Sequence, residues 1–137
     1  MFYKLTNRLR YFIELSYNGK NFHGWQYQPN AMSVQQTIEK SLEILLKQKI
    51  KILGAGRTDT GVHAKQMYAH FDFEEPIDLE NLIYKLNAFL IKDIGIANIH
   101  KVRHDSHARF DAISREYEYY ITPVSYTHLT LPTILLV

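Results

Sequence analysis

The chain has 137 residues, of which 46% are hydrophobic and 22% are charged, and its formal net charge is +2. This length suffices for one domain with its own hydrophobic core, and the composition is typical of a globular chain rather than a disordered one. The absence of cysteine excludes disulfides and thiolate metal sites, and no apolar run is long enough to span a bilayer. We therefore expect a cytoplasmic protein without a membrane segment.

Basic residues cluster in the chain although the net charge is small. Residues 100–115 contain four lysines or arginines and three histidines, but only two acids. Such clusters are usually solvated surface, and contact with phosphate groups is the second interpretation. The ten tyrosines, seven phenylalanines and one tryptophan likewise have two interpretations, as core side chains or as faces on which bases stack.

The first half of the chain begins with a strand and continues into a helix. Apolar and polar residues alternate over 10–17, which predicts a half-buried strand, and Asn18, Gly19 and Gly24 then indicate a loop. Ser33 and Gln36 form a capping-box pair, which predicts that a helix starts there and runs over 33–47. The apolar residues that follow at helical spacing are Val34, Ile38, Leu42, Leu45 and Leu46.

The second half of the sequence predicts four more strands and one helix. The expected elements are strands at 50–53, 67–73, 94–102 and 116–121, and a helix at 79–90 that follows Pro76 and is capped by Asp78. The order β-α-β-β-α-β plus an extra strand predicts an α+β fold. The simplest arrangement is a ferredoxin-like or RRM-like antiparallel sheet with two helices on one face.

The last residues do not fit this plan. The segment 125–137, SYTHLTLPTILLV, has no acid, lysine or arginine and ends on four aliphatic residues. A terminus seldom leaves such an apolar patch uncovered. We expect a domain over residues 1–124, followed by a non-native or disordered tail over 125–137.

The segment 54–64, GAGRTDTGVHA, is a glycine-rich loop with a carboxylate at its centre. It lacks the Gly-Lys-Ser/Thr ending of a P-loop and the glycine spacing of a dinucleotide fingerprint. Asp59 is either an Asx-turn residue that shapes the loop or a carboxylate nucleophile. Arg57 would favour the ionised carboxylate if it lay within ion-pair reach, or it could extend to a phosphate or replace a displaced base.

Five segments, in order, resemble motifs of the tRNA pseudouridine synthase A family. GAGRTDTGVHA is similar to the family's GRTDAGVHA signature, with Thr60 where alanine is usual. Asn18 replaces an aspartate and Ile91 a proline in two of the other segments. Those segments are YNGKNFHGWQYQ at 17–28, SVQ at 33–35, LNAFLIKDI at 86–94 and HARFDAISREYEYYI at 107–121. The resemblance therefore extends over most of the chain.

The resemblance implies a role for each of five residues. Asp59 corresponds to the nucleophile that attacks the target uridine, and Arg57 to the residue associated with extrusion of the base and with the charge of the aspartate. Tyr117 corresponds to the tyrosine that stacks on the uracil. Arg109 and Arg115, in the basic segment, are expected to bind substrate. A base inside a helix has to leave the stack before such chemistry can begin.

The resemblance also implies the setting of the reaction. The family isomerises uridine to pseudouridine in the anticodon arm of tRNA, without a metal, nucleotide or redox cofactor, and usually as a homodimer. Its members continue into a second, similarly folded half that supplies a basic residue to the aspartate. We therefore expect half of a two-domain fold, with little or no activity alone. The alternative is a non-catalytic RRM-like RNA-binding module, and the spacing of the histidines does not favour a metal site.

Overall fold

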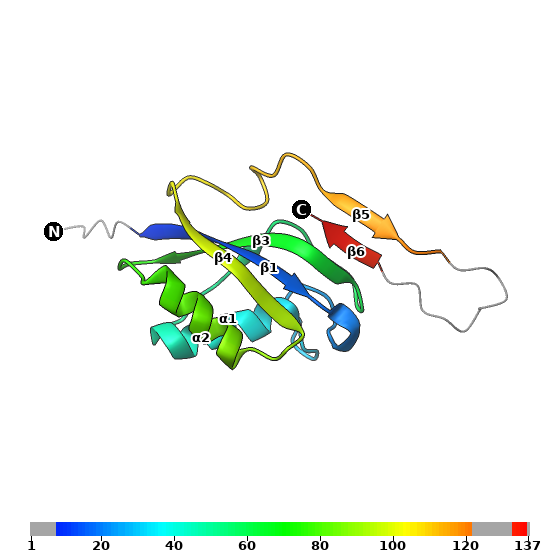
Figure 1. Ribbon diagram of the computed structural model, residues 1–137, viewed down its shortest axis with the longest axis horizontal. Coiled ribbons are helices and arrows are strands. Elements are labelled where there is room, and N and C mark those ends of the chain that lie inside the picture. The colour runs from blue at the N-terminus through cyan, green and yellow to red at the C-terminus, as the bar shows by residue number, and fades with distance from the viewer. Residues whose placement is uncertain (1–7, 122–132, 137) are drawn as a thin grey trace.

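The computed structural model describes residues 8–121 and the backbone of residues 133–136. It has an α+β fold in which two helices lie on one face of a sheet, as the sequence predicts (Figure 1). The strand order is β4-β1-β3-β6-β5, and the short β2 also pairs with β3. Three pairs of neighbouring strands are antiparallel: β4 with β1, β1 with β3, and β3 with β2. This arrangement matches the ferredoxin-like or RRM-like expectation.

The centre of the sheet consists of β1 (Leu9–Tyr17) and β3 (His63–Phe73), with β4 (Ile94–Val102) on the other side of β1. Alternate residues of β1 point into the core, because successive side chains of a strand face opposite sides of the sheet. The four core residues of β1 are at most 4% exposed; they are Tyr11, Ile13, Leu15 and Tyr17. The alternation read from the sequence is therefore confirmed.

Both helices begin at the capping residues expected from the sequence. Ser33 accepts a hydrogen bond from the amide of Gln36 at 3.2 Å at the start of α1 (Val34–Leu46). Asp78 accepts one from the amide of Asn81 at 3.3 Å at the start of α2 (Leu79–Phe89). The apolar stripes of the two helices then pack on the inner face of the sheet. Over the part of the chain that the structure describes, neither helix has the length and apolarity needed to cross a membrane.

The strand predicted at 50–53 was wrong in extent. Strand β2 contains only Leu53–Gly54, which pair with His70 and Ala69. Ile50 and Ile52 before it are buried without forming a ladder, and the carbonyl of Ile52 accepts a hydrogen bond from the side-chain amide of Gln35 at 2.8 Å. A side chain of α1 thus occupies the backbone acceptor that a longer strand would have used.

The remaining strands also differ from the predicted bounds. Strand β3 starts four residues earlier than expected, and β5 (Glu116–Tyr119) is shorter than 116–121. β5 pairs with β6 (Thr133–Leu136), which in turn pairs in parallel with the first residues of β3. The origin of the tail over 125–137 stays a prediction, and the backbone of 133–136 lies within the sheet.

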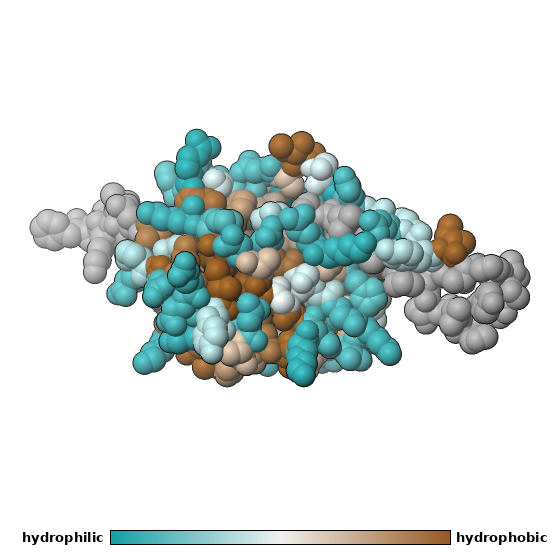
Figure 2. Space-filling view, viewed as in Figure 1, coloured by the Kyte–Doolittle hydropathy of each residue, from teal (hydrophilic) through white to brown (hydrophobic). Residues whose placement is uncertain are grey.

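The surface in the view of Figure 1 is largely hydrophilic. Figure 2 shows that apolar side chains are visible mainly over α2 and β4, between hydrophilic ones. The opposite face of the sheet from the helices is partly covered by the segment 103–115, which leads from β4 to β5 (Figure 1). This segment carries two of the basic residues that the sequence singles out.

Candidate functional site

The glycine-rich loop is fixed to the core by the residue directly before Asp59. The side chain of Thr58 is 9% exposed, and its hydroxyl shares a hydrogen bond of 2.8 Å with the phenol of Tyr17. The carbonyl of Thr58 accepts a hydrogen bond from the amide of Trp25 at 3.3 Å. Gly24 lies so close to this carbonyl that a Cβ atom would overlap its oxygen. The backbone on one side of Asp59 is therefore held by β1 and by the loop that follows it.

A tight turn holds the backbone on the other side of Asp59. The amide of Val62 donates to the carbonyl of Asp59 at 3.1 Å, and Gly61 has a φ of 82°. A left-handed residue in the third position is typical of a type II turn, where glycine is favoured. The amide of Gly61 also donates to the carbonyl of Phe22 at 3.2 Å. These contacts place Asp59 at the exposed tip of an anchored loop.

The hydrogen bond that closes this turn is accepted by the backbone carbonyl of Asp59 and not by its side chain. Within residues 8–121, the carboxylate of Asp59 has no hydrogen-bond donor, so the side chain does not form the Asx turn considered from the sequence. The ion pair considered with Arg57 does not form either, since no N–O distance between them is within 4.0 Å in this range. The carboxylate is thus open to an incoming group.

Arg57 and Arg109 meet at a small pocket beside the loop. The pocket has a volume of about 110 Å³, and its wall includes Gly54, Gly56 and Trp25. Both arginines are exposed residues, one in the loop and the other in the segment 103–115. Tertiary structure thus brings together two basic residues that are 52 positions apart, whereas Asp59 does not line this pocket.

The guanidinium of Arg115 is hydrogen-bonded to backbone carbonyls. Its guanidinium donates to the carbonyl of Ala55 from Nε at 2.9 Å and from Nη2 at 2.7 Å, and Nη2 also donates to the carbonyl of Arg109 at 2.9 Å. These bonds tie the beginning of the glycine-rich loop to the segment 103–115. The observed contacts of Arg115 are therefore those of a residue that positions the loop.

Tyr117 lies on β5 and is 48% exposed, so it is not an inward core residue of an alternating strand. Burial raises the pKa of Tyr17 to about 12, and the hydrogen bond with Thr58 lowers it in part. A side-chain link joins β5 to β3, since Lys65 donates to Glu118 at 2.9 Å.

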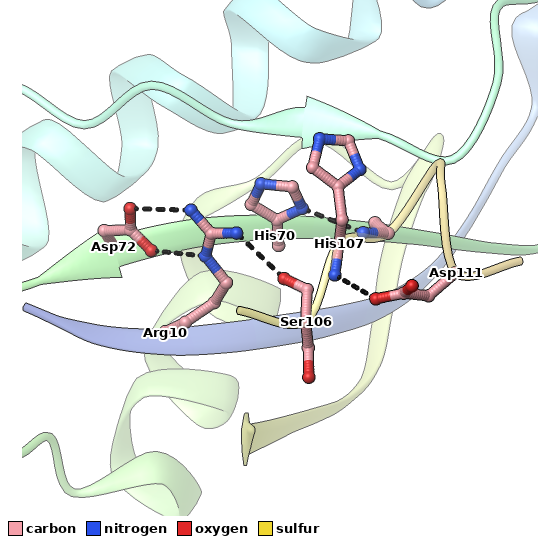
Figure 3. Close-up of polar contacts among 7 residues, drawn as sticks. Arg10, His70, Asp72, Ser106, His107 and Asp111 are labelled. Atoms are coloured by element: carbon pink, nitrogen blue, oxygen red, sulfur yellow. Dashed lines mark hydrogen bonds and ion pairs between the residues drawn. The ribbon is translucent and has the colours of Figure 1, made fainter. Parts of the chain in front are cut away.

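The segment 103–115 is fixed to the open face of the sheet by a polar cluster (Figure 3). Arg10 binds both carboxylate oxygens of Asp72, at 2.8 and 3.0 Å, and donates to the carbonyl of Ser106 at 2.8 Å. His70 accepts a hydrogen bond from the amide of Ala108 at 3.0 Å. Figure 3 shows Arg10 between Asp72 and Ser106, so one side chain joins two strands to the segment.

The environment of this cluster shifts the pKa values of His70 and Asp72, among others. Burial and then the neighbouring charge of Arg10 lower the pKa of His70 to about 4, and His107 contributes in the same direction. Hydrogen bonding from Arg10 lowers the pKa of the Asp72 carboxyl. Neutral His70 can accept the amide hydrogen bond at Nδ1, which fits its role as a structural residue. In the part of the chain that the structure describes, no three histidines or acids are grouped so that they could hold a metal ion.

Sequence reasoning missed the residues that hold the loop. Tyr17 was expected only as a core residue of the first strand, and Thr58 and Arg10 were given no role. The alternation over 10–17 could not distinguish a tyrosine that only packs from one whose hydroxyl bonds a residue 41 positions away. The sequence did offer one signal for this contact. Tyr17 and Thr58 each lie within a motif that resembles the family, and their hydroxyls can form a hydrogen bond with each other.

Comparisons with known proteins agree with the motifs. The profile of a family described as tRNA pseudouridine synthase matches residues 15–111. A tRNA pseudouridine synthase A of Parabacteroides distasonis is 61% identical over 114 residues, which cover 82% of this chain and 45% of that protein. The enzyme of the same name from Bacteroides fragilis is 50% identical over 118 residues, covering 85% of this chain and 47% of that protein.

More distant relatives bear the same name. One from Thermoanaerobacter pseudethanolicus is 40% identical over 109 residues. The chain spans a little under half the length of each of these relatives. Because the family profile matches well over half of the chain, and matches the part that contains the anchored loop, the chain belongs to the tRNA pseudouridine synthase family.

Proposed function

We propose that this chain carries the nucleophile of an enzyme that isomerises uridine to pseudouridine in tRNA, and that the nucleophile is Asp59. The observation that carries the proposal is the exposed carboxylate at the tip of a loop that is held on both sides. A fixed backbone positions a reacting group at low entropic cost, and an exposed carboxylate is able to attack. Family membership supplies the substrate class.

In the proposed reaction the carboxylate of Asp59 attacks the uridine, at C1′ of the sugar or at C6 of the uracil. The bond between N1 and C1′ breaks, the base rotates, and a bond forms between C5 and C1′. The bond between Asp59 and the nucleoside then breaks, which returns the free carboxylate. The hydrogen on C5 leaves as a proton and N1 gains one, so the product is an isomer of the substrate. The base has to be extruded from the RNA for this attack, which costs a few kcal/mol that RNA binding must supply.

We assign supporting roles to two exposed residues. Tyr117 would stack on the uracil, which agrees with the exposure of its ring on β5. Arg57 would assist the extrusion of the base, which agrees with its exposure next to Asp59 in sequence. The charge-partner role expected for Arg57 would need a second position of its side chain, because among residues 8–121 no ion pair joins it to Asp59.

We further propose that the substrate site is the anticodon arm of tRNA, that the enzyme acts as a homodimer, and that it works in the cytoplasm, where tRNA is found. The relatives are about twice as long as this chain. A second half would supply the basic residue that pairs with Asp59. Residues 1–124 would then be the nucleophile-carrying domain, and this chain alone would convert little or no uridine.

The test joins residues 1–124 of this chain to the remaining part of the Parabacteroides distasonis relative. Conversion is followed by the release of tritium from tRNA that carries uridine labelled at C5. The fusion is expected to release tritium, and Asp59→Asn to abolish the release while tRNA binding persists. The matched control is Asp105→Asn, which removes an exposed carboxylate from an exposed ion pair with Arg103 at 3.4 Å and should leave conversion unchanged.

The same variants separate the enzyme from the alternative, a non-catalytic RRM-like RNA-binding module. A binding module would release no tritium as a fusion, and Asp59→Asn would change nothing that can be measured. Normal conversion by Asp59→Asn would contradict the assignment of the nucleophile.

A further inference from the structure

The small pocket beside the glycine-rich loop has the features of an anion site. It contains two arginines from different segments, Arg57 and Arg109, and lies next to the backbone of Gly54 and Gly56. Neither guanidinium is in an ion pair with an acid among residues 8–121. Two arginine side chains that remain charged at any physiological pH and face one confined space create a positive potential there.

The indole of Trp25 is a second, independent indication of a ligand. Trp25 is only 1% exposed, yet it lines the pocket, and its Nε1 would be 2.5 Å from a Cβ atom placed on Gly54. Within the described part of the chain, Nε1 has no hydrogen-bond acceptor, while every polar side-chain atom sealed from solvent has a partner. The N–H of a buried indole is therefore in contact with the space of the pocket and can donate into it.

The side-chain amide of Gln35 is turned to other partners. Its oxygen accepts from the amide of Tyr27 at 2.8 Å and its nitrogen donates to Ile52. The charged groups of the pocket are the two guanidiniums, and with the indole N–H they are donors only. They favour a ligand with several acceptor oxygens and a negative charge.

The pocket is large enough for a tetrahedral oxyanion, since its volume is about 110 Å³. The reacting base must reach Asp59, which does not line the pocket. Guanidinium groups also match the geometry of phosphate oxygens and can bind them in pairs.

We propose that this pocket binds a backbone phosphate of the RNA, next to the nucleotide presented to Asp59. The identity of the ligand as RNA rests on the proposed function, whereas the anion site stands on the geometry alone. Trp25 and Arg109 are then RNA-binding residues, and Arg57 contributes its charge to the phosphate in the resting position that the structure shows.

The chain has one tryptophan, so the Trp25 indole N–H gives a single, directly assigned NMR signal. The intact 137-residue chain, labelled with ¹⁵N, is titrated with inorganic phosphate and, separately, with a short single-stranded RNA that contains uridine. Both are expected to shift the indole signal in a saturable way, and RNA at the lower concentration. Arg57→Gln and Arg109→Gln should each weaken both interactions at least about tenfold, the loss expected for one charge-assisted hydrogen bond.

The matched control is Arg103→Gln, which removes the same charge from the segment that carries Arg109. Arg103 lies outside the pocket and its side chain is 84% exposed. Its affinity should stay within about twofold of the unsubstituted chain at equal ionic strength, because exposed charges are screened by salt. Full amide spectra of all variants verify that they are folded.

Three results would overturn the proposal. One is an indole signal that moves with neither ligand, and another is an equal loss in all three arginine variants, which would indicate diffuse attraction. The third is a response to inorganic phosphate without a response to RNA. Asp59→Asn should keep the indole response in this chain while abolishing tritium release in the fusion, so failure of the phosphate site and failure of the isomerase proposal give different results.

Discussion

The phenol of Tyr17 and the hydroxyl of Thr58 share a buried hydrogen bond of 2.8 Å, which connects the end of β1 to the residue before Asp59. In Tyr17→Phe the ring still fills the core, but the Thr58 hydroxyl loses its partner. The free energy of unfolding should fall by about 1–3 kcal/mol, the cost of an unsatisfied buried polar group. Urea denaturation measures the change. Tyr84→Phe, at a side chain that is 75% exposed, is the control and should have no effect.

Substitutions at two glycines can separate the energetic cost of steric overlap from the cost of backbone strain. Gly24 and Gly61 have φ angles of 79° and 82°, but a Cβ atom on Gly24 would overlap the Thr58 carbonyl, whereas one on Gly61 would meet nothing within 4 Å. Gly61→Ala should cost about 1–2 kcal/mol for the left-handed conformation. Gly24→Ala should cost clearly more in the same denaturation experiment. Equal losses would show that the contact with Thr58 has no energetic consequence.

Arg115 should control the mobility of the loop that carries Asp59. Arg115→Lys keeps the charge but lacks the planar fork by which Nε and Nη2 bind the carbonyl of Ala55 together while Nη2 also reaches Arg109. Amide hydrogen exchange over residues 54–61 is expected to accelerate about tenfold or more, since a hydrogen bond from a charged group contributes about 1.5–3 kcal/mol. Arg103→Lys, at an exposed site, should leave these exchange rates unchanged.

His70 should make the protein less stable in mild acid. Its pKa is lowered from 6.5 to about 4 in the folded protein by burial and by Arg10, with His107 adding to the effect and Asp72 opposing it. Between these values the unfolded chain binds more protons, so stability falls as the pH drops from about 6.5 to about 4. Urea midpoints measured at several pH values show this loss.

The control for this prediction is His70→Asn, which does not titrate and whose side-chain oxygen can still accept from Ala108. The part of the pH dependence that belongs to His70 should disappear in this variant. An unchanged profile would show that the histidine is protonated equally in the folded and unfolded chains.

Glu39 on α1 should have the opposite dependence on pH. Burial raises the pKa of its carboxyl from 4.5 to about 7, against a smaller opposing effect from the backbone of Ile52. The folded protein retains a proton that the unfolded chain has lost, so stability decreases as the pH rises from 4.5 to about 7. Glu39→Gln should therefore be more stable than the unsubstituted chain above pH 7 and similar to it below pH 4.5. Glu75→Gln, at an exposed position, should show no such difference.

The order of elements followed from local patterns in the chain. Alternation over 10–17 and the caps at Ser33 and Asp78 are short-range signals, and the structure confirms them. The second strand was predicted with the wrong extent, because the carbonyl of Ile52 bonds to Gln35, which lies in another element. The periodicity of apolar residues indicates which side chains are buried, but it does not indicate which groups form hydrogen bonds with the backbone.

The sequence alone likewise predicted the glycine-rich loop, its resemblance to a family and the roles of Asp59 and Arg57, because these depend on consecutive residues. Only the folded chain determined that Arg57 faces Arg109 across a pocket and that Arg115 is bound to backbone carbonyls. These relationships join positions about fifty or sixty residues apart. They depend on how the segment 103–115 docks on the sheet through Arg10 and His70, and a linear pattern contains no information on that docking.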